Sequence, residues 1–123
     1  MPERIRDREI KICDGGSGKL PVVHVDDLCR AVVLALTRDA ATGHVYNVVD
    51  DHVAWQTYVD DVRDWFGSEP LESVGAGEGG VGEHDTRFLA DRIRKDLGYE
   101  PSKGYADGMA EARQWWEARG AGV

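Results

Sequence analysis

The chain has 123 residues, which is the size of one domain and too short for a cofactor domain plus a substrate domain. Hydrophobic residues make up 41% and charged residues 31%, so the chain can bury a core and is expected to fold. The formal net charge of -8 repels phosphate backbones and anionic membrane surfaces. Nucleic acid and membrane are therefore not expected as partners.

The two cysteines, Cys13 and Cys29, lack the paired spacing of a zinc site or a thioredoxin-like motif, and both are expected to be reduced, partly buried thiols. The N-terminal segment MPERIRDREIK is charged and contains no apolar signal region. No apolar run in the sequence is long enough to cross a bilayer. We therefore expect a cytoplasmic protein.

The first third of the chain predicts a strand, a glycine turn, a second strand and a helix. Residues 9–13 alternate in polarity, and the glycines after them favour a tight turn before the apolar run at residues 21–25. We expect these two strands to pair. Asp26 stands where a helix N-cap is favoured, and apolar residues then recur at helical spacing to about Arg38.

A third strand is predicted over residues 44–49, which are rich in valine and contain a tyrosine. Because a helix separates it from the strand at residues 21–25, the simplest arrangement is a parallel pair. A strongly periodic helix follows over residues 55–66, with Gly67 as its C-terminal stop.

The last third of the sequence predicts a flexible glycine-rich loop over residues 75–84, because glycines are frequent there and no apolar period is present. A short helix is expected over residues 88–97 and a final helix from Tyr105 to about residue 118. The elements together predict one mixed α/β (α+β) domain over residues 1–123. It should contain a small parallel or mixed sheet of three or so short strands packed with about four helices.

Three short patterns imitate functional motifs. Residues 75–80 match the letters of the G-x-G-x-x-G dinucleotide motif, but no helix is predicted after them to hold a pyrophosphate. Residues 14–19 lack the glycine spacing of a phosphate-binding P-loop. Tyr99 and Lys103 imitate the catalytic Tyr-x-x-x-Lys, but Pro101 between them opposes the helix that this pair needs. We assign no catalytic and no cofactor-binding residue.

Side chains of metal-ligand type occur at His24, Asp26 and Asp27 and again at residues 50–52. Their spacing forms no recognised metal site, and Asp26 already has a predicted role as a helix cap. We therefore predict no metal ligand in this chain.

Four landmarks in the expected order resemble one protein family. They are a glycine turn, strand and helix from Gly15 through Ala35 with His24-Val25-Asp26-Asp27, then Tyr46-Asn47-Val48, then residues 97–101 (LGYEP) and then Gly108. This order resembles the C-terminal, substrate-binding part of the extended short-chain dehydrogenase/reductases, the NAD-dependent epimerases and dehydratases. The resemblance implies that the Rossmann domain, which carries the NAD or NADP site and the catalytic tyrosine and lysine in this family, is absent here.

The chain departs from the nucleotide-sugar-binding members of the family at two places. These members carry an arginine just before the His-Val-x-Asp strand, where this chain has Lys19-Leu20-Pro21. They carry another arginine before the last short helix, where this chain has only Arg87. If a ligand site is retained, His24 at its strand end and Arg87 as an anion contact are the predicted substrate-binding residues.

Two functions follow as hypotheses. In the first, the chain is the substrate-binding portion of an epimerase/dehydratase-like protein that binds no cofactor by itself and acts only with a separate Rossmann-type polypeptide. In the second, it is a stand-alone binding or assembly module without enzymatic activity that self-associates to cover exposed apolar surface. A decayed gene is the third, functionally silent interpretation.

Overall fold

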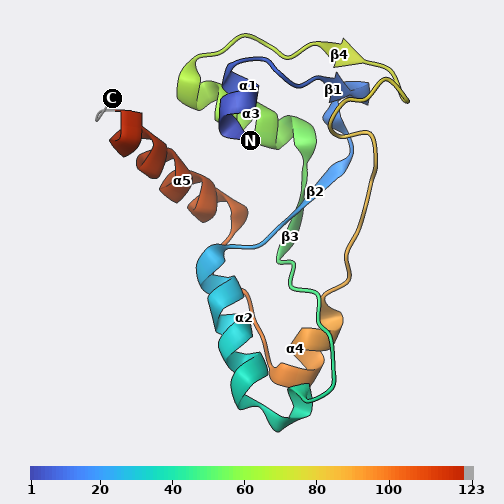
Figure 1. Ribbon diagram of the computed structural model, residues 1–123, viewed down its shortest axis with the longest axis vertical. Coiled ribbons are helices and arrows are strands. Elements are labelled where there is room, and N and C mark those ends of the chain that lie inside the picture. Colours follow the sequence, from blue (N-terminus) through green and yellow to red (C-terminus); the bar gives the residue numbers. More distant parts are fainter. Residues whose placement is uncertain (121–123) are drawn as a thin grey trace. The chain divides into compact units, whose positions relative to one another are not determined.

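The computed structural model describes residues 1–120, which form five α-helices and four short strands (Figure 1). The mixed α/β class predicted from the sequence is therefore confirmed. No helix within this described range is both long and apolar enough to cross a membrane. In chain order the elements are α1 (Pro2–Arg6), β1 (Ile12–Cys13), the 3-10 turn η1 (Asp14–Gly16), β2 (Lys19–Val22), α2 (Val25–Thr37), the 3-10 turn η2 (Asp39–Ala41), β3 (Asp51–Ala54), α3 (Trp55–Phe66), β4 (Ser73–Val74), α4 (Asp91–Leu97) and α5 (Tyr105–Gly120).

The chain divides into two compact units, although the sequence predicts a single domain over residues 1–123. Unit 1 comprises Met1–Leu20 and His52–Arg87, and unit 2 comprises Pro21–Asp51 and the chain from Phe88 onwards. Each unit thus combines two stretches of sequence. The division explains why neighbouring elements along the chain are not always neighbours in the fold.

In unit 1, strand β1 pairs in parallel with β4, with Ile12 opposite Ser73 and Cys13 opposite Val74. The Cys13 N–H also donates to the Val81 carbonyl at 2.8 Å. The prediction that residues 9–13 pair with residues 21–25 is therefore wrong. The segments on either side of the glycine-rich loop pair with β1 instead. Gly80 permits this close approach, since a Cβ there would lie 2.8 Å from the Cys13 nitrogen.

Helix α3 begins and ends at the residues that the sequence predicts, Trp55 and Phe66, and Gly67 stops it in the left-handed conformation (φ 59°). Its residues Val59 and Val62 are buried in unit 1. Helix α1, which the sequence analysis did not predict, contacts α3 and buries Ile5.

In unit 2 the core joins α2, η2, α4 and the segment after α4 through the buried residues Ala31, Ala41, Ile93, Leu97 and Tyr99. Helix α4 is shorter than predicted and begins at Asp91.

The residues just before α4 are exposed and lie outside the helix. Phe88 is 44% exposed and Leu89 is 75% exposed. The Leu89 carbonyl accepts a hydrogen bond from Asn47 Nδ2 at 3.3 Å, which holds this stretch of chain outside the helical ladder.

The strand predicted over residues 44–49 is absent from the described structure. A second two-stranded sheet pairs β2 with β3 instead, so the expected parallel pair between residues 21–25 and 44–49 is wrong. The contact between the two segments begins only at Asp50, whose N–H donates to the Val22 carbonyl at 2.9 Å. A strand needs a neighbour along its edge, and residues 45–49 have none within residues 1–120.

Candidate functional site

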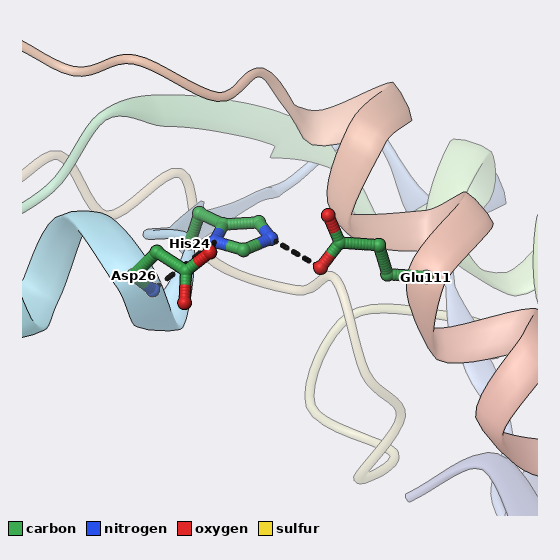
Figure 2. Close-up of side chains that lie close together, drawn as sticks. All are labelled: His24, Asp26 and Glu111. Carbon is green, nitrogen blue, oxygen red and sulfur yellow. Dashed lines mark hydrogen bonds and ion pairs between the residues drawn. The ribbon is translucent and has the colours of Figure 1, made fainter.

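The best candidate for a functional site is a cluster of polar side chains at the N-terminus of α2 in unit 2. His24 is the N-cap of this helix, and its Nδ1 accepts a hydrogen bond from the Asp26 N–H at 3.1 Å. Its Nε2 lies 3.0 Å from Oε2 of Glu111 on α5 (Figure 2). Because Nδ1 accepts, Nε2 carries the proton and donates to Glu111. The predicted cap, Asp26, is therefore wrong, since the helix starts two residues earlier than expected.

Lys103 joins the two acidic residues of this group. Its Nζ donates to Asp26 Oδ2 and to Glu111 Oε1, both at 2.7 Å. These hydrogen bonds raise the pKa of Lys103 and lower the pKa values of Asp26 and Glu111. The four side chains form an ion-pair network that connects the start of α2 with α5.

His24, Asp26 and Glu111 also present ligand atoms within 4.8 Å of one another, as a small metal site would (Figure 2). Two features oppose this use. The Lys103 ammonium already pairs with both carboxylates and offsets one of their two negative charges. Both ring nitrogens of His24 are already engaged, Nδ1 by the Asp26 amide and Nε2 by Glu111, so a metal would have to displace one of these hydrogen bonds. The geometry is that of a structural network.

Asp27, the neighbour of Asp26, is fully buried. It accepts hydrogen bonds from the Ser102 hydroxyl at 2.6 Å, from the Ser102 and Lys103 amides at 3.0 and 2.9 Å, and from Arg30 Nη1 at 2.5 Å. Burial raises the pKa of this carboxyl, but the donors outweigh it and lower the pKa to about 2. Asp27 thus fixes the segment after α4 onto α2.

The sequence analysis treated Asp27 only as a possible metal ligand and missed this role. A signal was present in the spacing, because Asp27 precedes the core residue Ala31 by four positions and so lies on the inner face of α2. A carboxylate on the inner face of a helix needs buried donors. Arg30 lies three residues away, but the donors Ser102 and Lys103 lie 75 and 76 residues away in the sequence, which spacing alone does not reveal.

Tyr99 and Lys103 lie between the end of α4 at Leu97 and the start of α5 at Tyr105. The prediction that no helix carries this pair is confirmed. The fully buried Tyr99 hydroxyl donates to Asp50 Oδ1 at 2.5 Å, and burial raises the pKa of Tyr99. Both side chains are thus engaged in holding unit 2 together.

The glycine-rich loop of unit 1 uses its amides internally. The Gly75 N–H donates to Glu78 Oε2 and the Gly77 N–H donates to Glu83 Oε1, both at 2.6 Å. No helix directly follows the glycines, as the sequence analysis expected, and the next helix begins at Asp91. Its own carboxylates therefore occupy the donors that a pyrophosphate would need. The flexibility predicted for residues 75–84 stays a prediction.

The two predicted substrate-binding residues have different surroundings. The His24 side chain is 5% exposed and both of its ring nitrogens are engaged. Arg87, in unit 1, is 69% exposed and lies 3.7 Å from the Asp85 carboxylate. His24 therefore acts as a helix cap in this structure, and Arg87 keeps an accessible guanidinium. Their roles as ligand contacts stay predictions.

Unit 2 also has an open groove of about 430 Å³. Of the lining residues within the described part of the chain, only Asn47 and Tyr46, both from the Tyr46-Asn47-Val48 landmark, carry a polar side-chain group, and the Tyr46 hydroxyl donates to Asp96. This lining suits contact with apolar surface better than binding of a charged group. The lining residues are Pro21, Val22, Val23, Leu28, Tyr46, Asn47, Val48, Val49 and Phe88.

Solved structures of epimerases and related enzymes share this fold. An epimerase from Methanothermobacter thermautotrophicus has a TM-score of 0.73 at 19% identity, over 95% of this chain and 35% of that chain. The enzyme WbmG from Bordetella bronchiseptica, in complex with NAD and UDP, has a TM-score of 0.72 at 19% identity, over 97% of this chain and 38% of that chain. The chain thus has the fold of a part of the epimerase and short-chain dehydrogenase/reductase enzymes.

Sequence comparison defines the family. The family described as the NAD dependent epimerase/dehydratase family matches residues 1–49. A dTDP-glucose 4,6-dehydratase from Streptomyces niveus is 30% identical over 125 residues, which cover 89% of this chain and 35% of that protein. The chain belongs to the NAD-dependent epimerase/dehydratase family, as its landmarks predict. It spans about a third of the length of the curated relatives that it matches.

Proposed function

We propose that this chain is the substrate-binding portion of an NAD-dependent epimerase/dehydratase-like protein, and that a polypeptide outside these 123 residues supplies the cofactor-binding half. The observation that carries this proposal is one of coverage. Nearly the whole chain matches family structures, whereas it covers only 35% to 38% of them. The chain is then catalytically incompetent alone.

The residues of the described chain do not fit an NAD or NADP site. The Gly75 and Gly77 amides are bound by Glu78 and Glu83, the Tyr99 hydroxyl is bound to Asp50, and the Lys103 ammonium is bound to Asp26. In the family the nicotinamide cofactor accepts and returns a hydride.

For the ligand we propose an anionic group that binds at Arg87. The guanidinium is exposed, and its distance of 3.7 Å to Asp85 leaves its hydrogen-bond donors available for a stronger anion such as a phosphate. His24, the other predicted contact, lies in unit 2, and its proposed role as a ligand contact is separate from that of Arg87. The cytoplasmic location expected from the sequence belongs to the same proposal.

A hybrid protein tests the proposal. The 123-residue chain replaces the stretch of the Streptomyces niveus dehydratase that it matches, and NAD(H) binding is measured by calorimetry for this hybrid and for the isolated chain. We expect the hybrid to bind NAD(H) and the isolated chain not to bind it. Tight NAD(H) binding by the isolated chain would overturn the proposal, and so would a folded hybrid that binds none.

The Arg87 contact is tested in the same hybrid with dTDP as the probe. Arg87→Ala should weaken dTDP binding about tenfold or more, because a hydrogen bond to a charged group is lost. Arg94→Ala, which removes an exposed guanidinium on α4, is the matched control and should change little. Equal affinities for the two variants would remove Arg87 from the site.

The second candidate, a self-associating module, is favoured by one observation. Helix α2 exposes large apolar side chains, with Val32 51% and Leu36 80% exposed. Soluble proteins rarely leave such a surface uncovered. Light scattering of the isolated chain over a wide concentration range tests this function, and a monomer at high concentration would contradict it.

A further inference from the structure

The sequence contains two Asp-Gly pairs, Asp14-Gly15 and Asp107-Gly108. An aspartate side chain reacts with the main chain most readily when glycine follows it, because glycine has no Cβ to hinder its backbone nitrogen. The structure places the two pairs in different surroundings. The first lies in the 3-10 turn η1 of unit 1, and the second lies in the first turn of α5 in unit 2.

The Asp14-Gly15 pair is exposed and strained. The φ of Asp14 is 45°, in the left-handed region that a residue with a side chain disfavours, and Gly15 and Gly16 continue there with φ of 66° and 68°. Apart from its chain neighbours, Gly15 has no heavy atom within 4 Å of the place that a Cβ would take. Within residues 1–120 no hydrogen bond or ion pair holds the Asp14 carboxylate. The pair can therefore rearrange without losing a side-chain contact.

The Asp107-Gly108 pair is held in place by two hydrogen bonds. Asp107 Oδ2 accepts from the Gly104 N–H at 2.9 Å, and the Gly108 N–H donates to the Gly104 carbonyl at 3.2 Å. The carboxylate and the backbone nitrogen that would have to react with each other are thus both engaged. Reaction at this pair requires both hydrogen bonds to break first, so it provides an internal control for Asp14-Gly15.

We infer that Asp14-Gly15 is a site of spontaneous isoaspartate formation. The Gly15 nitrogen attacks Cγ of the protonated Asp14 carboxyl group, so that an N–Cγ bond forms, a water molecule leaves and a succinimide ring results. Water then opens the ring. Attack at the main-chain carbonyl carbon of Asp14 breaks its bond to the Gly15 nitrogen and leaves the chain connected through Cγ, whereas attack at Cγ restores aspartate. The water that is lost is regained, so the change is an isomerisation and needs no other reactant.

The modification would act on a tightly packed part of unit 1. Isoaspartate inserts the Cβ of Asp14 into the main chain, two residues before the buried Gly16. A Cβ on Gly16 would lie 2.6 Å from Ile12 Cδ1 and 2.7 Å from the Gln56 nitrogen, so this backbone has no room to move toward β1 or α3. We therefore expect isoaspartate at Asp14 to lower the stability of unit 1.

Ageing of the 123-residue chain at neutral pH and body temperature tests the inference. Isoaspartate is located by peptide mapping with electron-transfer dissociation, in samples whose circular dichroism shows the helices. It should form at Asp14 about tenfold or more faster than at Asp107, where two hydrogen bonds must break first. In concentrated urea the two pairs should react at similar rates. Similar rates in the folded sample, or faster reaction at Asp107, would overturn the inference.

Two matched variants separate this site from general ageing. Asp14→Glu should abolish the reaction at position 14, because a glutamate side chain must close a larger ring, whereas Asp107→Glu should leave it unchanged. Urea unfolding of the aged native chain should reveal a less stable fraction that carries isoaspartate at position 14 and that aged Asp14→Glu lacks. The inference fails if aged Asp14→Glu loses stability to the same extent, or if the isoaspartate fraction is as stable as fresh protein.

Discussion

Asp27 and Ser102 form two hydrogen bonds to each other, one from the serine hydroxyl at 2.6 Å and one from its backbone amide at 3.0 Å. The pair joins the first turn of α2 to the segment that follows α4. Because the carboxylate is fully buried, its removal leaves donors without an acceptor. The pair is therefore expected to be central to the stability of unit 2.

Asp27→Ala should lower the free energy of unfolding by about 2–4 kcal/mol, since Ser102, Lys103 and Arg30 lose a buried charged partner. Urea denaturation followed by circular dichroism measures this change. Asp26→Ala is the matched control, because its carboxylate is exposed, and it should have a much smaller effect. Equal effects at the two positions would contradict the role of Asp27.

The pH dependence of stability should also report on Asp27. Its pKa is about 2 in the folded chain and near 3.8 when unfolded, so its contribution is present above pH 3.8 and is lost as the pH falls toward about 2. Denaturant unfolding across this acid range should show falling stability in the native chain. Asp27→Asn has no group to titrate there, so its profile should be flatter. Parallel profiles would exclude Asp27 as a cause of acid sensitivity.

The cap at the start of α2 provides a third prediction. His24→Ala should lower the free energy of unfolding by about 0.5–2 kcal/mol, because the Asp26 amide loses its acceptor. His24→Asn restores an N-cap acceptor without reaching Glu111, and it should recover most of this loss. Thermal melting curves of both variants measure the effect. An asparagine variant as unstable as the alanine variant would show that the link to Glu111 matters more than the cap.

Gly80 in unit 1 provides a fourth prediction. A Cβ at this position would lie 2.8 Å from the Cys13 nitrogen, so Gly80→Ala should displace β1 and cost about 1–3 kcal/mol. Gly104→Ala is the control, since its Cβ would meet only the Asp107 carboxylate at 3.7 Å. Chemical denaturation compares the two variants. A stable Gly80→Ala protein would mean that the loop and β1 are less closely joined than the structure indicates.

The local elements were predictable from sequence because their signals are local. Helix α3 follows from its apolar period and from Gly67, and α2 was predicted to within two residues at its start and one at its end. The start of α2 was misassigned because Asp26 is a common N-cap residue and histidine is not. The local sequence does not show that His24 is buried and held in place by Glu111 on α5.

The strand predicted at residues 44–49 failed for a different reason. Its composition is suitable, but a strand forms only where a second segment supplies hydrogen-bond partners. The polar network was equally hidden, because His24 and Glu111 are 87 residues apart and Asp27 and Ser102 are 75 apart. Such pairs depend on how the whole unit folds.

The two cysteines differ in a way that gives the chain a built-in reporter. Cys13 is buried, which raises the pKa of its thiol and lowers its reactivity. Cys29, by contrast, is exposed on α2 among the exposed apolar side chains of that helix. A maleimide fluorophore should therefore label the native protein selectively at Cys29 without any engineered mutation. The emission of the fluorophore would change when the exposed face of α2 becomes covered. The kinetics of assembly can therefore be recorded with the unaltered polypeptide.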